Sequence, residues 1–214
     1  MSEHGFPYII VGIFVLLIGF FTGLFVKSIL PNIVVIISVV YSAFMFLFFR
    51  DPKRQTLPDP NAIISPADGK IIKVDELEDD QFVGNCLRIR IFMSLINVHV
   101  VRMPVDGIIT KITKYPGKFY PAFSKKAGNT NARASLQITS PIGNLKLHLI
   151  AGFLARRIVC YPTGEDKWSA GEKIGFIKFG SAVDIFIPRN FELQLKLGDK
   201  VVGGESIIAY GKKE

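Results

Sequence analysis

Two apolar segments near the start of the chain constrain its structure more than any other feature of the sequence. Residues 6–26 form an uncharged run, residues 33–49 form a second one, and a short turn around Lys27 separates them. As a helix rising 1.5 Å per residue, the first run measures about 31 Å, which is enough to cross the hydrocarbon core of a bilayer. The second run is near the lower length limit for a span. The sequence therefore predicts a two-helix membrane anchor within residues 1–54.

Basic residues end the second apolar run abruptly. Arg50, Lys53 and Arg54 follow it within five positions, and the positive-inside rule places such a cluster in the cytoplasm. We therefore expect a protein of the cell membrane whose remaining residues face the cytoplasm. Two alternatives stay open, a re-entrant hairpin and a signal peptide followed by a buried helix. The signal peptide is disfavoured because the run lacks a preceding positive charge and a small-residue cleavage site.

Nearly all of the charge lies downstream of this anchor. The chain has 26 Lys and Arg against 18 Asp and Glu, whereas its first 50 residues contain only Glu3, Lys27 and Arg50. The basic residues are scattered and match no nucleic-acid-binding signature, so an anionic membrane surface is favoured over nucleic acid as a partner. Two cysteines, Cys86 and Cys160, make no disulfide framework, and with three histidines in the chain no metal site is expected.

The sequence after residue 55 predicts strands joined by tight turns. Short runs rich in Ile, Val and Phe alternate with Asp-Gly, Pro-Gly and Gly-Gly, and no long stretch keeps a 3.6-residue period. A phrase of Pro, a Gly turn and an alternating strand recurs at 65–74, 103–112 and 140–147. The glycine of an Asp-Gly pair suits a turn position with positive φ. We expect a mainly β domain, a compact sandwich or barrel of lipoyl-like β-turn-β units, with a long functional loop at 116–133.

Six segments, taken together and in order, resemble the short form of the phosphatidylserine decarboxylase family over nearly the whole chain. A Gly-Ser pair alone, such as the one at 180–181, more often marks a bulge or a close backbone approach. The other segments give this pair its weight. The matching segments are 65–71, 92–107, 115–119, 131–133, 150–158 and the Phe-Gly-Ser sequence at 179–181.

The resemblance implies a self-processing proenzyme with a pyruvoyl cofactor. The hydroxyl of Ser181 would attack the carbonyl of Gly180, and elimination would cleave the chain into a β chain, 1–180, and an α chain, 181–214. The pyruvoyl group left at position 181 would form a Schiff base with a substrate amine and accept the electrons released with CO2. The implied substrate is a serine phospholipid, with ester-linked acyl tails as in phosphatidylserine or ether-linked isoprenoid tails as in archaetidylserine. The product is the ethanolamine lipid, and a homo-oligomer is compatible with this interpretation.

The resemblance also implies candidates for the base relay of self-cleavage. Asp68 matches the aspartate of the family's Ser-Pro-x-Asp-Gly phrase, and His99 matches the first histidine of its His-x-x-His-x-Pro phrase. Arg102 stands where that phrase has its second histidine, and arginine cannot act as a base at neutral pH. Either His99 takes over the role or processing uses another arrangement. Without the resemblance, Asp68 is more often a turn residue and His99 a hydrogen-bonded strand residue.

Basic and aromatic residues near the long loop are candidates for lipid contacts. Arg133, which belongs to the Asn-x-Arg match, is the residue we select to bind a headgroup phosphate. The aromatic residues of the loop either enter the membrane interface or cover the core. These are Phe119, Tyr120 and Phe123, and the remaining basic candidates are Lys118, Lys125, Lys126, Arg156 and Arg157.

Two other function classes remain to be weighed. A membrane-anchored binding or adaptor module of the lipoyl or biotinyl type would explain the repeated β-turn-β phrases. However, the chain has no Met-Lys pair for a carrier and no long helical hairpin for an adaptor. A serine hydrolase using an uncleaved Ser181 is disfavoured because no nucleophile-elbow motif surrounds that residue.

Overall fold

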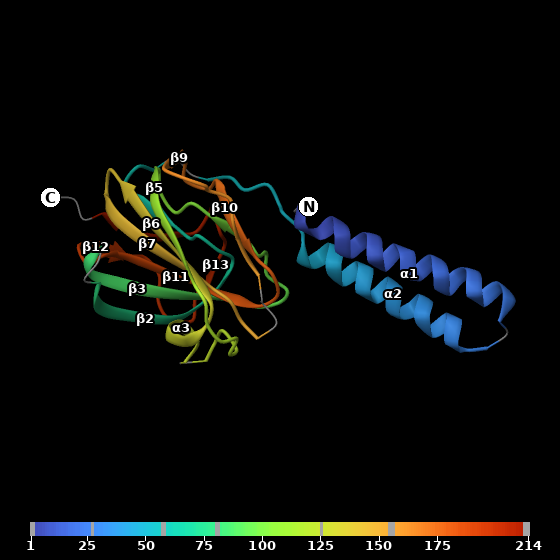
Figure 1. Ribbon diagram of the computed structural model, residues 1–214. Coiled ribbons are helices and arrows are strands. Elements are labelled where there is room, and N and C mark those ends of the chain that lie inside the picture. Colours follow the sequence, from blue (N-terminus) through green and yellow to red (C-terminus); the bar gives the residue numbers. More distant parts are fainter. Residues whose placement is uncertain are drawn as a thin grey trace. The chain divides into compact units, whose positions relative to one another are not determined.

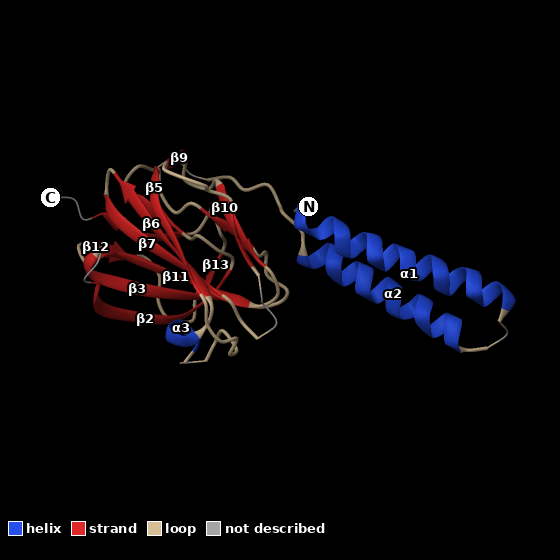
Figure 2. Ribbon diagram, viewed as in Figure 1, coloured by secondary structure: helices blue, strands red, loops and turns tan. Residues whose placement is uncertain are grey.

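The computed structural model describes residues 3–26, 28–56, 59–79, 82–124, 126–153 and 157–211. The chain divides into two compact units, a helical unit spanning Met1–Pro52 and a β unit spanning Lys53–Glu214. The two units are labelled along the chain in Figure 1 and coloured by secondary structure in Figure 2. The expected class, a mainly β protein preceded by two apolar helices, is confirmed.

The helical unit contains a short 3-10 helix, η1 (Glu3–Gly5), followed by α1 (Phe6–Phe25) and α2 (Leu30–Phe48). Each long helix has a proline in its first turn, where the missing N–H removes no helical hydrogen bond. Both helices are long and apolar enough to cross a membrane by length and composition. Their large side chains are mostly exposed, as at Phe14 and Phe21, so they are suited to membrane association.

Two glycines allow α1 to pack closely against α2. Gly12 and Gly19 lie seven residues apart, a spacing that keeps them on one face of the helix. A Cβ atom added at Gly12 would lie 2.3 Å from the Oγ atom of Ser42. Small residues drive association between apolar helices because they let the backbones approach. The two helices therefore form a hairpin held by a glycine-lined contact.

We expect the Gly12→Leu substitution to force the two helices apart, because the leucine side chain would occupy the space of Ser42. Electron–electron resonance between spin labels on the two helices, in a cysteine-free background, should report a longer distance. Gly23→Leu is the matched control, since a Cβ atom there comes no closer than 3.4 Å to Pro31. Equal distances in the two variants would contradict the glycine-lined contact.

The β unit folds as three sheets whose paired strands run antiparallel. The largest sheet has the order β13-β2-β3-β11-β7-β6-β5-β9, and the two smaller ones have the orders β1-β14-β12 and β4-β10-β8. The strands are β1 (Ala62–Ile64), β2 (Gly69–Asp79), β3 (Gly84–Met93), β4 (Val100–Arg102), β5 (Gly107–Tyr115), β6 (Arg133–Ser140), β7 (Gly143–Ile150), β8 (Ile158–Cys160), β9 (Asp166–Trp168), β10 (Lys173–Ile177), β11 (Ser181–Pro188), β12 (Phe191–Leu193), β13 (Lys200–Val201) and β14 (Ile207–Gly211).

One face of the large sheet packs on the two smaller sheets and forms the core. Ile91, Leu147 and Val183 from the large sheet join Ile177 and Ile208 from the smaller ones in one buried cluster. This arrangement is a sandwich, one of the two architectures that the sequence predicts. Strand β11 lies in the middle of the large sheet, between β3 and β7, so the end of the chain is built into the core.

The recurring proline-glycine phrases do begin strands, but the expected backbone conformation of the Asp-Gly glycines is wrong. Strands β2, β5 and β7 start at Gly69, Gly107 and Gly143. Of these, only Gly143 has a φ in the left-handed region. Gly69 and Gly107 are instead required because the neighbouring strand leaves no space for a side chain at these positions. A Cβ atom at either would come within 2.6 Å of a carbonyl oxygen on the neighbouring strand, that of Phe92 or Thr139.

The long loop expected at 116–133 is confirmed between β5 and β6. It contains one helical turn, α3 (Ala127–Thr130), and Lys118 forms an isolated bridge with Asn131 across its base. The loop lies against the face of the large sheet that is turned away from the core, where Ala122 packs on Ile150 and Ala182. It therefore covers the sheet beside the start of β11.

Candidate functional site

The connection from β10 to β11 has a strained backbone. Phe179 and Gly180 both have φ of 65°, and Phe179 is the one residue other than glycine with positive φ in the described part of the chain. A bulky residue in the left-handed region costs on the order of 1–3 kcal/mol and persists where the surrounding structure enforces it. The sequence does not reveal this strain, because nothing about Phe179 as a residue type favours it.

Ser181 is the first residue of β11, and its side chain points into the core. It is fully buried, pairs with Met93 across the sheet, and donates its hydroxyl hydrogen bond to the Sδ atom of Met93 at 3.3 Å. A thioether sulfur is a weak acceptor, so the hydroxyl is free to reorient at little cost. It therefore lies in buried surroundings, one residue after the strained Phe179–Gly180 turn.

From the loop between β3 and β4, His99 contacts the preceding peptide, Phe179–Gly180. Its Nε2 atom accepts the backbone N–H of Gly180 at 3.2 Å, and its Nδ1 atom lies 2.9 Å from the carbonyl oxygen of Asn97. These partners assign the proton to Nδ1 and a lone pair to Nε2, because a backbone N–H donates and a carbonyl accepts. The imidazole is fully buried. A basic nitrogen thus lies one residue from the hydroxyl of Ser181.

Gly152, which sequence reasoning missed as an individual residue, touches the carbonyl oxygen of Gly180. A Cβ atom at position 152 would lie 2.1 Å from that oxygen. Gly152 follows β7, whose last residue, Ile150, pairs with Ala182 of β11. The segment 150–158 drew attention only as part of the family resemblance, and the close approach depends on the fold.

If the chain cleaves itself after Gly180, as the resemblance implies, we expect Gly152→Ala to prevent that cleavage, because the methyl group would displace the carbonyl of Gly180. Overpacking of this kind also destabilises a fold by about 1–3 kcal/mol. Gel analysis should show an uncleaved chain, and thermal unfolding should report the loss of stability. Gly164→Ala is the control, since a Cβ atom there meets nothing within 4 Å. Normal cleavage of Gly152→Ala would show that this contact has no role in positioning the carbonyl.

Asn131 is a second residue that the sequence did not single out for a role of its own. It is fully buried, and its Nδ2 atom donates to the carbonyl oxygens of Tyr120 and Ala151, both at 2.7 Å. Its Oδ1 atom accepts the N–H of Tyr120 at 2.9 Å. Asn131 thus fastens the long loop to the residue that precedes Gly152.

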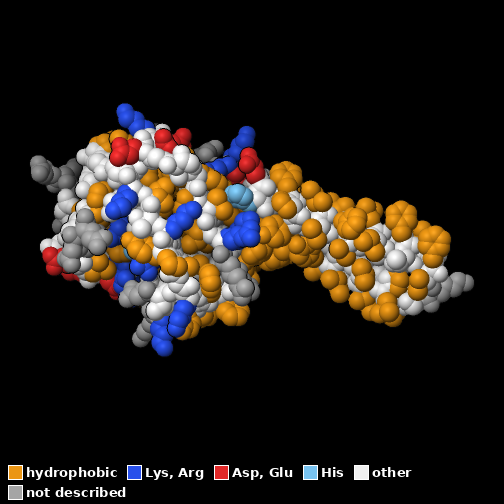
Figure 3. Space-filling model, viewed as in Figure 1, with side chains coloured by type: hydrophobic (Ala, Val, Ile, Leu, Met, Phe, Trp, Pro, Cys, Tyr) orange, Lys and Arg blue, Asp and Glu red, His pale blue; other side chains and the backbone are white. Residues whose placement is uncertain are grey.

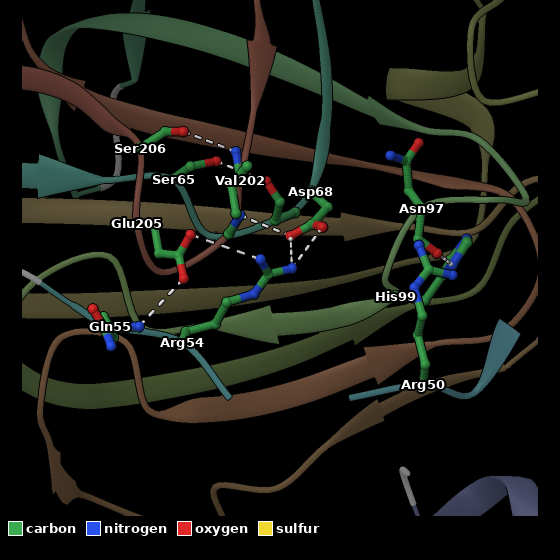
Figure 4. A network of polar contacts seen from close by, with 12 residues as sticks. Arg50, Arg54, Gln55, Ser65, Asp68, Asn97, His99, Val202, Glu205 and Ser206 are labelled. Atoms are coloured by element: carbon green, nitrogen blue, oxygen red, sulfur yellow. Dashed lines mark hydrogen bonds and ion pairs between the residues drawn. The ribbon is translucent and has the colours of Figure 1, made fainter. Parts of the chain in front are cut away.

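Asp68 lies in a different polar network from His99. Its carboxylate accepts two hydrogen bonds from Arg54, at 3.0 and 2.8 Å, and one from the N–H of Gly203 at 2.8 Å. Figure 4 shows Asp68 with Arg54 and the loop at Val202–Glu205, whereas His99 lies beside Asn97 in another part of the view. Asp68 therefore stabilises the turn before β2, and these contacts do not bring its carboxylate to the Gly180 peptide.

Arg102 and Arg133 also lie apart from the hydroxyl of Ser181. Arg102 is buried and donates from Nη1 to the carbonyl oxygen of Gly171 at 2.9 Å. The guanidinium of Arg133 lies over the ring of Tyr115, 4.6 Å from its centroid. Arg133 pairs with Ile150, which pairs with Ala182, so these three share the sheet face opposite to Ser181. The candidates Lys125 and Arg156 lie outside the described residues.

The two cysteines are free thiols, as expected. Burial raises the pKa of the Cys160 thiol, and the charge of Lys114 offsets this effect only in part. The thiol of Cys160 is therefore protonated at neutral pH and is a poor nucleophile. Among the described residues, no group of three or more His, Cys, Asp or Glu side chains is arranged to hold a metal ion.

An apolar pocket opens beside the strained turn. Its volume is about 480 Å³, and its walls come from the loops after β3, β5 and β7 together with the turn itself. This volume is within the usual range for small-molecule sites. The pocket is lined by Phe92, Ser94, Leu95, Ile96, Pro121, Ala122, Phe123, Phe153, Phe179 and Gly180.

Comparison with known proteins agrees with the resemblance seen in the sequence. Residues 41–209 match the family model described as phosphatidylserine decarboxylase. Similar proteins called phosphatidylserine decarboxylase proenzyme occur in Desulfotalea psychrophila, with 41% identity over 83% of this chain and 84% of the relative. Another, in Prosthecochloris aestuarii, has 39% identity over 90% of this chain and 89% of the relative. A third, in Burkholderia ambifaria, has 40% identity over 78% of each chain.

Proposed function

Since this chain belongs to the phosphatidylserine decarboxylase family and is a decarboxylase, we propose that it matures by cleaving itself between Gly180 and Ser181 and then removes CO2 from a serine phospholipid. The observation that carries this proposal is the strained Phe179–Gly180 turn, with His99 on the N–H of Gly180 and the buried side chain of Ser181 directly following it in the chain.

Self-cleavage starts with the transfer of an acyl group. His99 accepts the proton of the Ser181 hydroxyl through Nε2, and Oγ attacks the carbonyl carbon of Gly180. The bond from that carbon to the nitrogen of Ser181 breaks, the nitrogen takes up the proton, and an ester joins Gly180 to Oγ. Relief of the strain at Phe179 favours this step. A serine nucleophile requires a base within hydrogen-bond reach, and His99 is the buried base that contacts the residue before Ser181.

Elimination then breaks the chain. Removal of the Cα proton of Ser181 expels the Gly180 carboxylate from Cβ and leaves a dehydroalanine at position 181. Its imine tautomer takes up water and releases ammonia, which leaves a ketone at the start of the α chain. Asp68 contributes indirectly, by holding the turn before β2 through Arg54 and Gly203.

The surroundings of residue 181 fit a pyruvoyl group. Gly152 leaves room at the carbonyl before it, and the apolar pocket opens at the turn. Such a group supplies a ketone that binds the substrate amine and takes up the electron pair left by CO2. In this site His99 holds or delivers a proton, and we assign Arg133 to the headgroup phosphate. The substrate has either ester-linked or ether-linked tails.

The fold keeps the α and β chains together after cleavage. The α chain begins with β11, which stays paired with β3 and β7 of the β chain. Asp184 of the α chain forms two buried hydrogen bonds of 2.6 Å with Arg90 of the β chain. Burial opposes the charge on Arg90, but the hydrogen bonds and charge of Asp184 outweigh it, so the pKa of this guanidinium is raised. Removing one partner from such a pair is strongly destabilising.

We propose residues 1–54 as the membrane anchor and residues 55–214 as the catalytic domain, facing the cytoplasm.

The function is tested by incubating the purified chain with phosphatidylserine labelled in the serine carboxyl group. We expect labelled CO2 and ethanolamine lipid in equal amounts without added cofactor. If purified, cleaved protein released no label from either the ester or the ether lipid, the proposed substrate class would be rejected.

A further inference from the structure

Large apolar side chains are exposed on three loops around the strained turn. Ile96 is 68% exposed, and Phe123 and Phe153 are each 66% exposed. They come from the loops after β3, β5 and β7, and all three line the pocket that contains Gly180. Phenylalanine is seldom this exposed in a soluble domain, and adjacent residues of this kind mark an interaction surface. We call these three side chains the apolar rim.

The apolar rim belongs to a wider concentration of exposed apolar residues. Phe119 and Tyr120, on the same loop as Phe123, are each 37% exposed. Phe123 also packs edge-on against Phe92, with ring centroids 5.8 Å apart. This contact holds Phe123 at the mouth of the pocket, although most of its surface remains uncovered. The aromatic residues of the loop thus do not cover the core.

Basic residues flank the apolar rim. Lys118 and Lys126 lie on either side of Phe123 in the long loop, and both are exposed. Arg157 and Lys178 are joined by a backbone hydrogen bond of 3.1 Å, and Lys178 directly precedes Phe179 of the pocket. In Figure 3, blue basic and orange apolar side chains occur together at the lower edge of the β unit, where Figure 1 labels α3.

We propose that this face of the β unit docks on an anionic lipid bilayer, with the apolar rim entering the interface. Exposed apolar residues surrounded by cations match a bilayer surface, where acyl chains underlie a layer of phosphates. To match this surface, a protein partner would need an apolar protrusion surrounded by acidic side chains. Docking places the mouth of the pocket, which Phe179 and Gly180 line, at the level of the headgroups. The inference rests on the proposed function in taking a bilayer lipid as the substrate.

Depth-dependent fluorescence quenching tests the docking in the full-length chain. The chain has a single tryptophan, Trp168, whose buried Nε1 has no hydrogen-bond partner, so Trp168→Phe removes the native signal with no hydrogen bond lost. Phe123→Trp and Phe153→Trp then report on the apolar rim. Phe82→Trp is the matched control, because Phe82 precedes β3 while the site lies at its other end, about 30 Å away at 3.3 Å per residue.

The variants are reconstituted in vesicles of phosphatidylcholine and phosphatidylglycerol that contain spin-labelled acyl chains. We expect at least twofold stronger quenching for the two rim variants than for Phe82→Trp, and a decrease when phosphatidylglycerol is omitted. Equal quenching at all three positions would overturn the proposal. The proposal would also be overturned if the fluorescence of the rim variants were unaffected by the lipid but changed with protein concentration in detergent. That result would indicate that the face binds a second copy of the chain.

A Ser181→Ala background separates this inference from the proposed function. Docking needs no cleavage, so the quenching pattern should persist in that background. A chain that retains Ser181 and docks but never cleaves would refute the self-processing step alone. A chain that cleaves and decarboxylates without rim quenching would refute the docking alone.

Discussion

The Ser181→Ala variant is expected to remain one uncleaved chain and to release no CO2 from a serine phospholipid. Alanine has no hydroxyl to attack Gly180, and position 181 cannot then become a ketone. The loss should be complete, because the nucleophile and the source of the cofactor are the same residue. Gel analysis and a CO2-release assay measure the two losses separately.

Ser135→Ala is the matched control for this variant. Ser135 is also a buried serine on a strand of the large sheet. It pairs with His148, which in turn pairs with Asp184, three residues after Ser181, so its side chain lies on the opposite face from that of Ser181. Cleavage should proceed normally in this control. A Ser181→Ala chain that still decarboxylated would show that the enzyme acts without a cofactor made from this residue.

The His99→Gln variant is expected to cleave about 10²- to 10⁴-fold more slowly, which is the usual contribution of a general base. Glutamine can still accept the N–H of Gly180, as Nε2 of His99 does, but it cannot take the proton of Ser181. The rate is measured by following the appearance of the fragment 181–214 after synthesis of the chain.

His148→Gln serves as the control for this second variant. His148 lies on the opposite face of the sheet, where its ring contacts Phe186 with centroids 4.7 Å apart. We expect its cleavage rate to match that of the unchanged chain. If His99→Gln cleaved as fast as His148→Gln, the base would have to be sought elsewhere, and Asp68 would be the next candidate to replace.

The helices and the strand-starting turns could be predicted from the sequence because they depend on local patterns. Apolar runs of the right length gave α1 and α2, and the recurring proline-glycine phrases marked the starts of β2, β5 and β7. The conformations of Gly69 and Gly107 could not be predicted. Each is a glycine because a Cβ atom would collide with a carbonyl oxygen of the neighbouring strand, that of Phe92 or Thr139, and these neighbours are known only from the fold.

The sequence could predict only those site residues whose type or motif indicates a chemical role. Ser181, Gly180 and His99 were identified in the sequence, and the fold brings His99 onto the N–H of Gly180, the residue before Ser181. The strain at Phe179 and the contact of Gly152 with the Gly180 carbonyl depend on how β7, β10 and β11 meet. No local sequence pattern predicts either feature. Asp68 was selected by its motif, but its contacts with Arg54 and Gly203 are those of the turn residue that the sequence alone also allows.

Intact-mass spectrometry of the purified, active protein tests the central claim most directly. We predict two chains, one ending at Gly180 and one beginning at position 181. The second should be lighter than the hydrolysis product by the mass of one ammonia, and borohydride reduction in the presence of the serine lipid should attach the lipid amine to it. Active protein with a single chain that still contains Ser181 would contradict the account.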